Sequence, residues 1–120
     1  MAQILVAEPN RETRELLELI VSRLGFDPIS REISELAGHA ELEAAIIEPA
    51  DPESLRLAQE LRAGCPSLPI VFTSIEPQAA HARELDPAAY LLKPFRLSAL
   101  TETLRGLVTK PARRPGASSG

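Results

Sequence analysis

The chain has 120 residues, of which 44% are apolar and 25% are charged, so we expect one globular domain with a single core. The net charge is −4, and the excess of acid is concentrated in residues 1–109, which hold 17 acidic and 10 basic residues. An acidic domain without a basic stripe repels phosphate backbones, which argues against direct nucleic-acid binding. No apolar run approaches the ~20 residues of a membrane span, and a single cysteine excludes an intramolecular disulfide.

Two segments are expected, a domain over residues 1–109 and a flexible basic tail over residues 110–120. The tail reads Lys-Pro-Ala-Arg-Arg-Pro-Gly-Ala-Ser-Ser-Gly, and its Pro, Gly and Ser content is typical of a linker. A linker at this end is compatible with a C-terminal output domain beyond it. The opening residues are apolar and have no basic leader, so we expect no signal peptide and a cytoplasmic location.

Short apolar runs alternate with amphipathic stretches along the chain, which is the rhythm of a parallel sheet covered by helices on both faces. The expected strands are Gln3–Ala7, Pro28–Ser30, Leu42–Ile47, Ile70–Thr73 and Ala88–Leu92. The expected helices are Arg11–Leu24, Glu32–Ala37, Pro52–Gly64, Glu76–Glu84 and Leu97–Val108. Asn10 is suited to cap the start of the first helix, and Gly25 is suited to follow its end.

Helical spacing predicts which side chains of these helices face the core. In the first helix they are Leu16, Leu17, Ile20 and Leu24. In the third they are Leu55, Ala58 and Leu61, and in the last they are Leu97, Leu100, Leu104 and Leu107.

Polar side chains follow four of the predicted strands directly: Glu8, Glu48, Ser74 and Lys93. The carboxyl ends of parallel strands meet at one edge of a doubly wound sheet, and the binding crevice of such folds lies there. Lys93 stands out because the chain contains eleven arginines and only two lysines. Each residue taken alone is explained by its meeting water at a strand end, but the four together indicate a working or degenerate site.

The chain resembles a response-regulator receiver domain from Gln3 to about Val108. The resemblance rests on five segments: Ile4-Leu-Val-Ala-Glu-Pro-Asn10, Leu24-Gly-Phe26, Ala45-Ile-Ile-Glu-Pro-Ala-Asp-Pro52, Leu68-Pro-Ile-Val-Phe-Thr-Ser74 and Tyr90-Leu-Leu-Lys-Pro-Phe95. It implies an α/β fold, a doubly wound five-stranded parallel sheet of the (βα)5 flavodoxin-like type. In this family two acids after the first strand help to hold Mg²⁺, and an aspartate after the third strand accepts a phosphoryl group.

The resemblance also implies switch positions and a signalling face. A Ser or Thr after the fourth strand and the lysine of a Lys-Pro pair contact the phosphoryl group, which places Ser74, Lys93 and Pro94 in these roles, with Tyr90 as a further switch position. The Lys93-Pro94 peptide is expected to be cis. Protein partners, or a second copy of the chain, are expected on the face of helix 4, strand 5 and helix 5, around Glu76–Glu84, Ala89–Leu91 and Leu97–Leu107. The segments Asp27–Glu41 and Ile75–Ala89 are shorter than is usual in the family, which suggests that this face has been rebuilt.

The chain departs from the family at the two positions that carry its chemistry. The pair of acids reads Glu8-Pro9, and the phosphoacceptor position reads Glu48. Proline offers no side-chain ligand, and Mg²⁺ needs several hard oxygen ligands in near-octahedral geometry. Glutamate also places its carboxylate one methylene farther from the backbone, where small displacements cost large factors in rate. We therefore expect no bound metal, no cofactor and no phosphotransfer at Glu48.

The longer side chain of Glu48 suggests a different role. Its carboxylate is expected to reach Lys93 and form an ion pair that fixes the domain in one state, as a built-in substitute for the phosphate. Asp51 is the rival acceptor, but an acid at this position is better explained by the start of the next helix.

Three functions are considered on these grounds. The leading interpretation is a phosphorylation-independent pseudo-receiver, a non-enzymatic module for protein–protein interaction or dimerisation in bacterial signal transduction. The alternative is a working phosphoacceptor receiver of a two-component system that uses Asp51 or an unconventional site. A domain that binds a small anion through Lys93 is the third, and the acidity around the site disfavours it.

Overall fold

The computed structural model describes residues 2–30, 42–75 and 84–107. In chain order the elements are β1 (Gln3–Ala7), α1 (Arg11–Arg23), β2 (Asp27–Ser30), β3 (Leu42–Ile47), α3 (Pro52–Gly64), β4 (Ile70–Ser74) and β5 (Ala89–Leu92). Residues 97–107 form a further helix. No helix within the described ranges is both long and apolar enough to cross a membrane.

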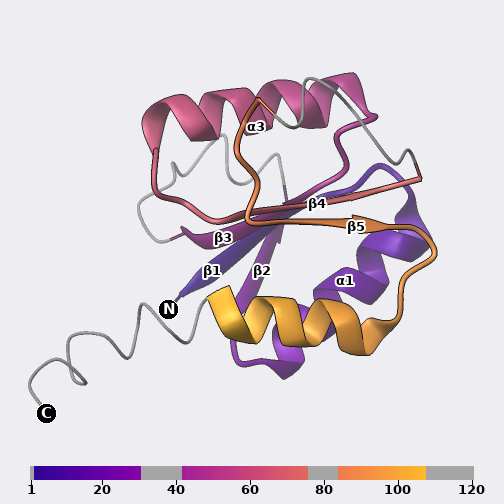
Figure 1. The fold of residues 1–120 in the computed structure, drawn as a ribbon. Coiled ribbons are helices and arrows are strands. Elements are labelled where there is room, and N and C mark those ends of the chain that lie inside the picture. The colour runs from indigo at the N-terminus through magenta and orange to yellow at the C-terminus, as the bar shows by residue number, and fades with distance from the viewer. Residues whose placement is uncertain (1, 31–41, 76–83, 108–120) are drawn as a thin grey trace, which may run out of the picture.

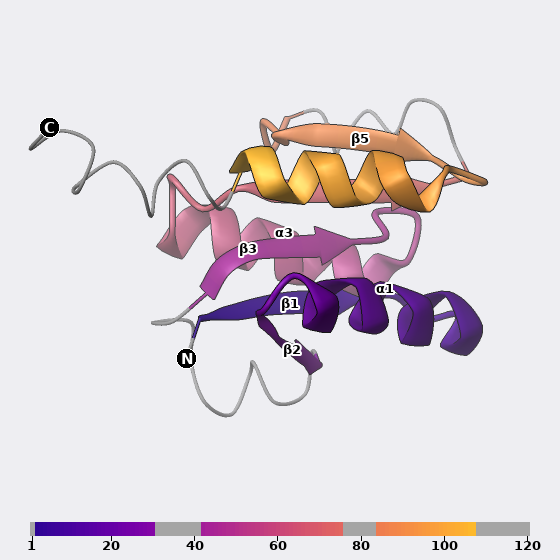
Figure 2. The same ribbon diagram turned by 90° about the horizontal axis from the view of Figure 1, so that it is seen from below.

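The five strands form one parallel sheet in the order β2-β1-β3-β4-β5. Helix α3 covers one face of the sheet, and α1 and the helix of residues 97–107 cover the other (Figures 1 and 2). The predicted doubly wound α/β fold is therefore confirmed. The strand order reverses between β1 and β3, which is where ligand crevices form in sheets of this type.

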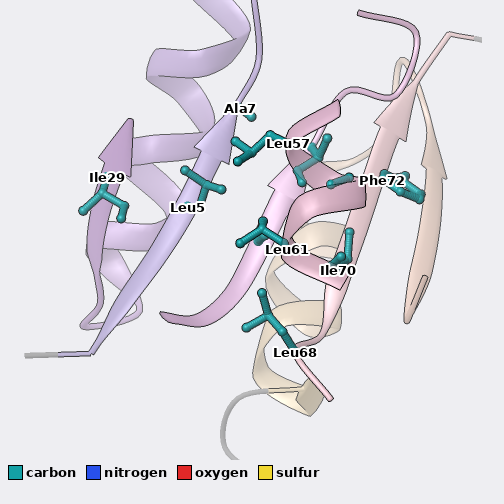
Figure 3. Packing of buried hydrophobic residues seen from close by; sticks show 11 residues of the cluster. Leu5, Ala7, Ile29, Leu57, Leu61, Leu68, Ile70 and Phe72 are labelled. Carbon is teal, nitrogen blue, oxygen red and sulfur yellow. The ribbon is translucent and has the colours of Figure 1, made fainter. Parts of the chain in front are cut away.

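Two apolar cores lie on the two faces of the sheet, because successive residues of a strand point to opposite sides. Ile47 of β3 belongs to the core under α3, whereas its neighbour Ile46 belongs to the core under α1. Figure 3 shows the α3 side, where Leu57 and Leu61 of the helix lie among the buried side chains of the strands, with Leu5, Ile70 and Phe72 in the same cluster. All four residues of Ala44–Ile47 are fully buried, which explains why this part of β3 is apolar at every position.

The helix ends follow the sequence signals. The Asn10 side chain accepts a hydrogen bond from the backbone N–H of Thr13 (2.9 Å), which caps the start of α1. Gly25 follows the end of α1 with a φ of 93°, a left-handed conformation that glycine adopts without steric cost. Pro52 occupies the first turn of α3, where its missing N–H would have no helical partner.

The predicted inward faces need three corrections. In α1 Leu16 is 41% exposed, and Val21 is buried in its place, because the buried positions Leu17, Ile20 and Val21 follow the i, i+3, i+4 spacing. In α3 Leu57 is buried, whereas Leu55 is only half-buried. Leu97, in the first turn of its helix, is 45% exposed, while Leu100 and Leu104 are fully buried as predicted.

Some expectations fall on residues that the structure does not describe. The expected helix Glu32–Ala37, all but the last residue of the expected helix Glu76–Glu84, and the expected tail 110–120 lie outside the described residues.

Candidate functional site

The carboxyl ends of β1, β3 and β5 bring three charged side chains together. Glu8 follows β1, Glu48 follows β3 and Lys93 follows β5. The Lys93 Nζ lies 2.7 Å from Glu8 Oε1 and 2.8 Å from Glu48 Oε1. The ion pair expected between Glu48 and Lys93 is present, and Glu8 joins it as a second partner that the sequence reasoning did not predict.

All four carboxylate oxygens of this cluster accept hydrogen bonds. While both Oε1 atoms accept from the Lys93 ammonium, Glu8 Oε2 accepts from the backbone N–H of Asn10 (3.0 Å) and Glu48 Oε2 from that of Ala50 (2.8 Å). The side chains of Glu8 and Glu48 are only 2% and 8% exposed. Burial of carboxylates is costly unless they are paired and hydrogen-bonded, and here both conditions are met.

Lys93 is held as an ammonium by its surroundings. Burial by itself lowers the pKa of Lys93, but the hydrogen bonds to Glu48 and Glu8 and the negative charges of both carboxylates outweigh it and raise the pKa above its ordinary value. The lysine therefore remains a charged bridge between the two acids at neutral pH.

The backbone around Lys93 fixes its position. The Lys93 N–H donates to the carbonyl oxygen of Ser74 (2.8 Å), which ties the end of β5 to the end of β4. The Lys93-Pro94 peptide bond is cis. Ser74 is fully buried, and Tyr90 on β5 is half-buried with its ring edge-on to Phe72 (centroids 6.1 Å apart).

The residues present do not fit a magnesium ion of the kind that the receiver resemblance implies. The neighbour of Glu8 is Pro9, whose side chain has no ligand atom. The two carboxylates that remain are already engaged on every oxygen by Lys93 and by backbone amides. Over the described ranges, no group of three or more His, Cys, Asp or Glu residues could hold a metal ion.

Asp51 lies near this cluster but has a structural role. It is the N-cap of α3, and its Oδ2 accepts hydrogen bonds from the Ser54 backbone N–H (3.0 Å) and the Ser54 hydroxyl (2.7 Å). The sequence argument that an acid here starts the next helix agrees with this geometry. Both contacts stabilise the first turn of α3.

An open cavity of about 510 Å³ borders the cluster, with Lys93, Glu48 and Asn10 among its lining residues. A second cavity, of about 450 Å³, lies against β1, and its lining residues include Arg14, Asp51 and Glu53. Carboxylates line both cavities, and Lys93 is already paired. The setting is therefore unfavourable for an anion.

The sequence signal for the missed contacts was present. Both acids stand in the pattern Glu-Pro-X, Glu8-Pro9-Asn10 and Glu48-Pro49-Ala50. Proline has no N–H, so the first amide available to the carboxylate after each strand belongs to the residue after the proline. The repeated pattern gives the same carboxylate-to-amide hydrogen bond at the ends of β1 and β3.

No protein-family profile matches this sequence, and no curated protein is significantly similar to it. Solved structures do match. The chemotaxis protein CheY4 of Vibrio cholerae has a TM-score of 0.75 at 19% identity, with 89% of this chain and 98% of that chain covered. A signal receiver domain of two-component signal transduction (histidine kinase) from Clostridium thermocellum has a TM-score of 0.73 at 16% identity, with 89% and 97% covered.

The chain has the fold of a response-regulator receiver domain. NtrX from Brucella abortus, solved in complex with ADP, matches as well, with a TM-score of 0.76 at 20% identity. That match covers 99% of this chain but only 29% of the NtrX chain, so this receiver fold also occurs within a much longer protein.

Proposed function

We propose that this chain is a pseudo-receiver, a non-enzymatic domain that binds a protein partner in bacterial, cytoplasmic signal transduction without being phosphorylated. The observation that carries the proposal is the state of Glu48. This residue stands where the resemblance places the phosphoacceptor, and both of its carboxylate oxygens are engaged, one by Lys93 Nζ and one by the Ala50 N–H. Glutamate at this position also carries its carboxylate one methylene farther from the backbone than aspartate would, and Lys93 holds it there, away from the geometry that phosphoryl transfer requires.

Pro9 supports the same conclusion from the other side of the pocket. Phosphoryl transfer depends on positioning and on neutralising the charge that develops on the phosphoryl oxygens. Here the Lys93 ammonium is instead paired with both Glu8 and Glu48, and the position after Glu8 carries no acid. The cluster is thus arranged to hold one conformation, with an internal ion pair in the place of a bound phosphate.

The partner is proposed to bind at the face that includes β5 and the helix of residues 97–107. β5 is an edge strand of the sheet, and large apolar side chains are exposed on and beside it. Leu92 is 47% exposed, Leu97 45% and Ile75 71%. Apolar side chains that gather at one edge are common where proteins associate. A protein partner, a second copy of the chain or an output domain that follows the basic residues 110–120 are the occupants to test.

The proposal is tested by incubating the chain with Mg²⁺ and a small phosphodonor such as acetyl phosphate and measuring its intact mass. We expect no added phosphate. A stable or transient gain of one phosphate would overturn the proposal and favour the alternative, a phosphoacceptor receiver that uses Asp51 or another site.

A matched variant makes the negative result informative. The double substitution Pro9→Asp with Glu48→Asp restores two adjacent acids and shortens the acceptor side chain by one methylene. We expect this variant to gain phosphate under the same conditions, because it regains a carboxylate pair for the metal and loses the reach of Glu48 toward Lys93. If it gains none while remaining folded, other differences account for the inactivity.

The signalling role has its own test. Glu48→Ala removes the carboxylate and should change both stability and the affinity for a partner captured with the wild-type domain. A variant with unchanged stability and unchanged affinity would count against a fixed, ion-paired state as the active form.

A further inference from the structure

Helix α1 carries a narrow stripe of side chains on the surface that faces away from the sheet. Leu16 and Leu19 are 41% and 47% exposed, and Glu12 and Arg23 are exposed as well. Their spacing of four, three and four residues places them in one line along a helix. From the start of α1 to its end the stripe consists of Glu12, Leu16, Leu19 and Arg23, and it extends over about 16 Å of the helix axis.

We propose that this stripe is the contact surface of a homodimer, in which two copies of α1 pack antiparallel about a two-fold axis. Alternating spacings of three and four residues let two helices pack along a shared seam. In the antiparallel arrangement Leu16 lies against the partner's Leu19, and Glu12 lies beside the partner's Arg23. Both pairs have the same midpoint along the helix, so a single two-fold axis generates the contacts in both directions.

Charge complementarity favours a second copy in this orientation. The stripe is acidic at the start of α1 and basic at its end, so it is complementary to its own reverse. Parallel pairing would place Glu12 beside the partner's Glu12 and Arg23 beside the partner's Arg23, and like charges across an interface are costly. The helix dipole favours an acid in the first turn and a base in the last, but it does not require them to stand in line with two exposed leucines.

The surroundings of the stripe permit this pairing. Glu15 flanks it, but this acid already forms an ion pair with Arg11 of the same helix (3.3 Å), and across the axis it would meet the uncharged Ser22 of the partner subunit. Figure 2 shows α1 on the outside of the sheet, where no other helix of the described residues covers it. A second copy can therefore approach the exposed side of α1 directly.

The stripe is separate from the face proposed for a protein partner. Helix α1 packs against β1 and β2, whereas β5 forms the opposite edge of the sheet. A dimer joined through α1 leaves Leu92 and Leu97 exposed on each copy, so the assembly would offer two partner surfaces. The inference does not depend on whether the chain is phosphorylated.

Sedimentation velocity of the full chain tests the dimer, under reducing conditions that keep the free Cys65 from cross-linking two copies. One pair of short helices buries less than the roughly 1,200 Å² of a stable interface, so we expect a reversible dimer with a Kd on the order of 100 µM. Glu12→Arg and Arg23→Glu should each weaken it at least about tenfold, because like charges replace both complementary pairs. An equimolar mixture of the two variants should dimerise like the wild type, since each supplies the charge that the other lacks.

Leucine substitutions distinguish this surface from the β5 face. Leu16→Ser with Leu19→Ser should abolish the dimer, whereas Leu92→Ser with Leu97→Ser, at similarly exposed positions, should leave it unchanged. The reverse pattern would overturn the inference and place the second copy at β5. A wild type that stays monomeric up to about 1 mM would also overturn it, as would a mixture of the charge variants that dimerises no better than either alone.

A measurement on the wild type keeps the inference testable if a variant does not fold. The amide signals of Leu16 and Leu19 should shift with concentration between about 20 and 500 µM, which brackets the expected Kd, while those of Leu92 and Leu97 should not. Shifts confined to Leu92 and Leu97, or no shifts at either surface, would contradict the proposed dimer.

Discussion

Glu8 and Glu48 make the same two contacts from different strands. In each, Oε1 accepts from the Lys93 ammonium, and Oε2 accepts from the backbone N–H two residues later. Each acid is followed by a proline, so in both loops the carboxylate meets the N–H of the residue after the proline. Lys93, after β5, forms an ion pair with both acids and so connects the ends of β1, β3 and β5.

The substitution Lys93→Met should destabilise the domain strongly. It leaves two buried carboxylates facing each other without a counter-charge, and breaking a buried ion pair from one side typically costs about 3–5 kcal/mol. Because the Lys93 side chain is 18% exposed and water can reach the pocket, we expect about 3 kcal/mol, the low end of that range. Urea unfolding measures the change.

A surface pair provides the control for this experiment. Arg11 and Glu15 form an ion pair on α1 with side chains 81% and 61% exposed, so Arg11→Gln should cost about 0.5 kcal/mol or less. A Lys93→Met variant as stable as Arg11→Gln would show that the buried cluster adds little to stability.

Stability should fall at alkaline pH through the titration of Lys93. Its pKa is raised in the folded state from an ordinary value of 10.5, so folding is favoured by its bound proton. This contribution is complete below pH 10.5 and is lost as the pH rises through the higher folded pKa. The difference in unfolding free energy between wild type and Lys93→Met, measured by urea unfolding at pH 8 and then in steps upward, should shrink only in that alkaline range. Other groups that titrate there are common to both proteins. A constant difference across the range would contradict the raised pKa.

The sheet could be read from the sequence because its signals are local. A parallel strand that is buried on both faces needs apolar side chains on both, and β3 shows this over Ala44–Ile47, after the half-buried Leu42 and Glu43. Caps behave likewise, since Asn10 and Asp51 act within the first turn of their own helices. Side chains placed by packing were harder to predict. Leu16 and Leu17 are adjacent and chemically identical, and only the packing of α1 against the sheet determines that Leu17 is the buried one.

The sequence predicted which residues gather at this site, but only some of the contacts between them. Strand ends and the Lys-Pro pair pointed to Glu8, Glu48 and Lys93. The sequence argument paired Lys93 with Glu48 alone, because nothing local says that one ammonium reaches two acids on strands that become neighbours only in the folded sheet. A backbone N–H has no sequence signature of its own, so the contacts to the Asn10 and Ala50 amides are marked only indirectly, by the repeated Glu-Pro-X pattern.

Arg62 is predicted to stabilise the end of the domain opposite the ion-pair cluster. Its guanidinium donates to five backbone carbonyl oxygens in two loops, those of Cys65, Pro66 and Leu68 after α3 and those of Leu85 and Asp86 before β5. Arg62→Ala should lower the unfolding free energy by about 2 kcal/mol, since hydrogen bonds to a charged donor contribute about 1.5–3 kcal/mol net.

Arg62→Lys should recover less than half of that loss, because a single ammonium cannot span both loops as the planar guanidinium does. Urea unfolding measures both, and faster hydrogen exchange at Ala88, whose N–H bonds to Ile70, should accompany the loss. A fully stable Arg62→Lys would mean that charge alone, rather than the fork, holds the loops.

Two substitutions of Asp51 test whether this residue acts as a helix cap or as a phosphoacceptor. As the N-cap of α3 it accepts from Ser54 twice through Oδ2, so Asp51→Ala should lower the unfolding free energy by about 1 kcal/mol. Asn caps helices about as well as Asp, and Asp51→Asn should therefore stay within a few tenths of a kcal/mol of the wild type. Neither substitution should alter the intact mass after treatment with acetyl phosphate and Mg²⁺. A phosphate that appears on the wild type and disappears in Asp51→Asn would identify Asp51 as the acceptor, because that variant keeps the capping oxygen and loses only the carboxylate.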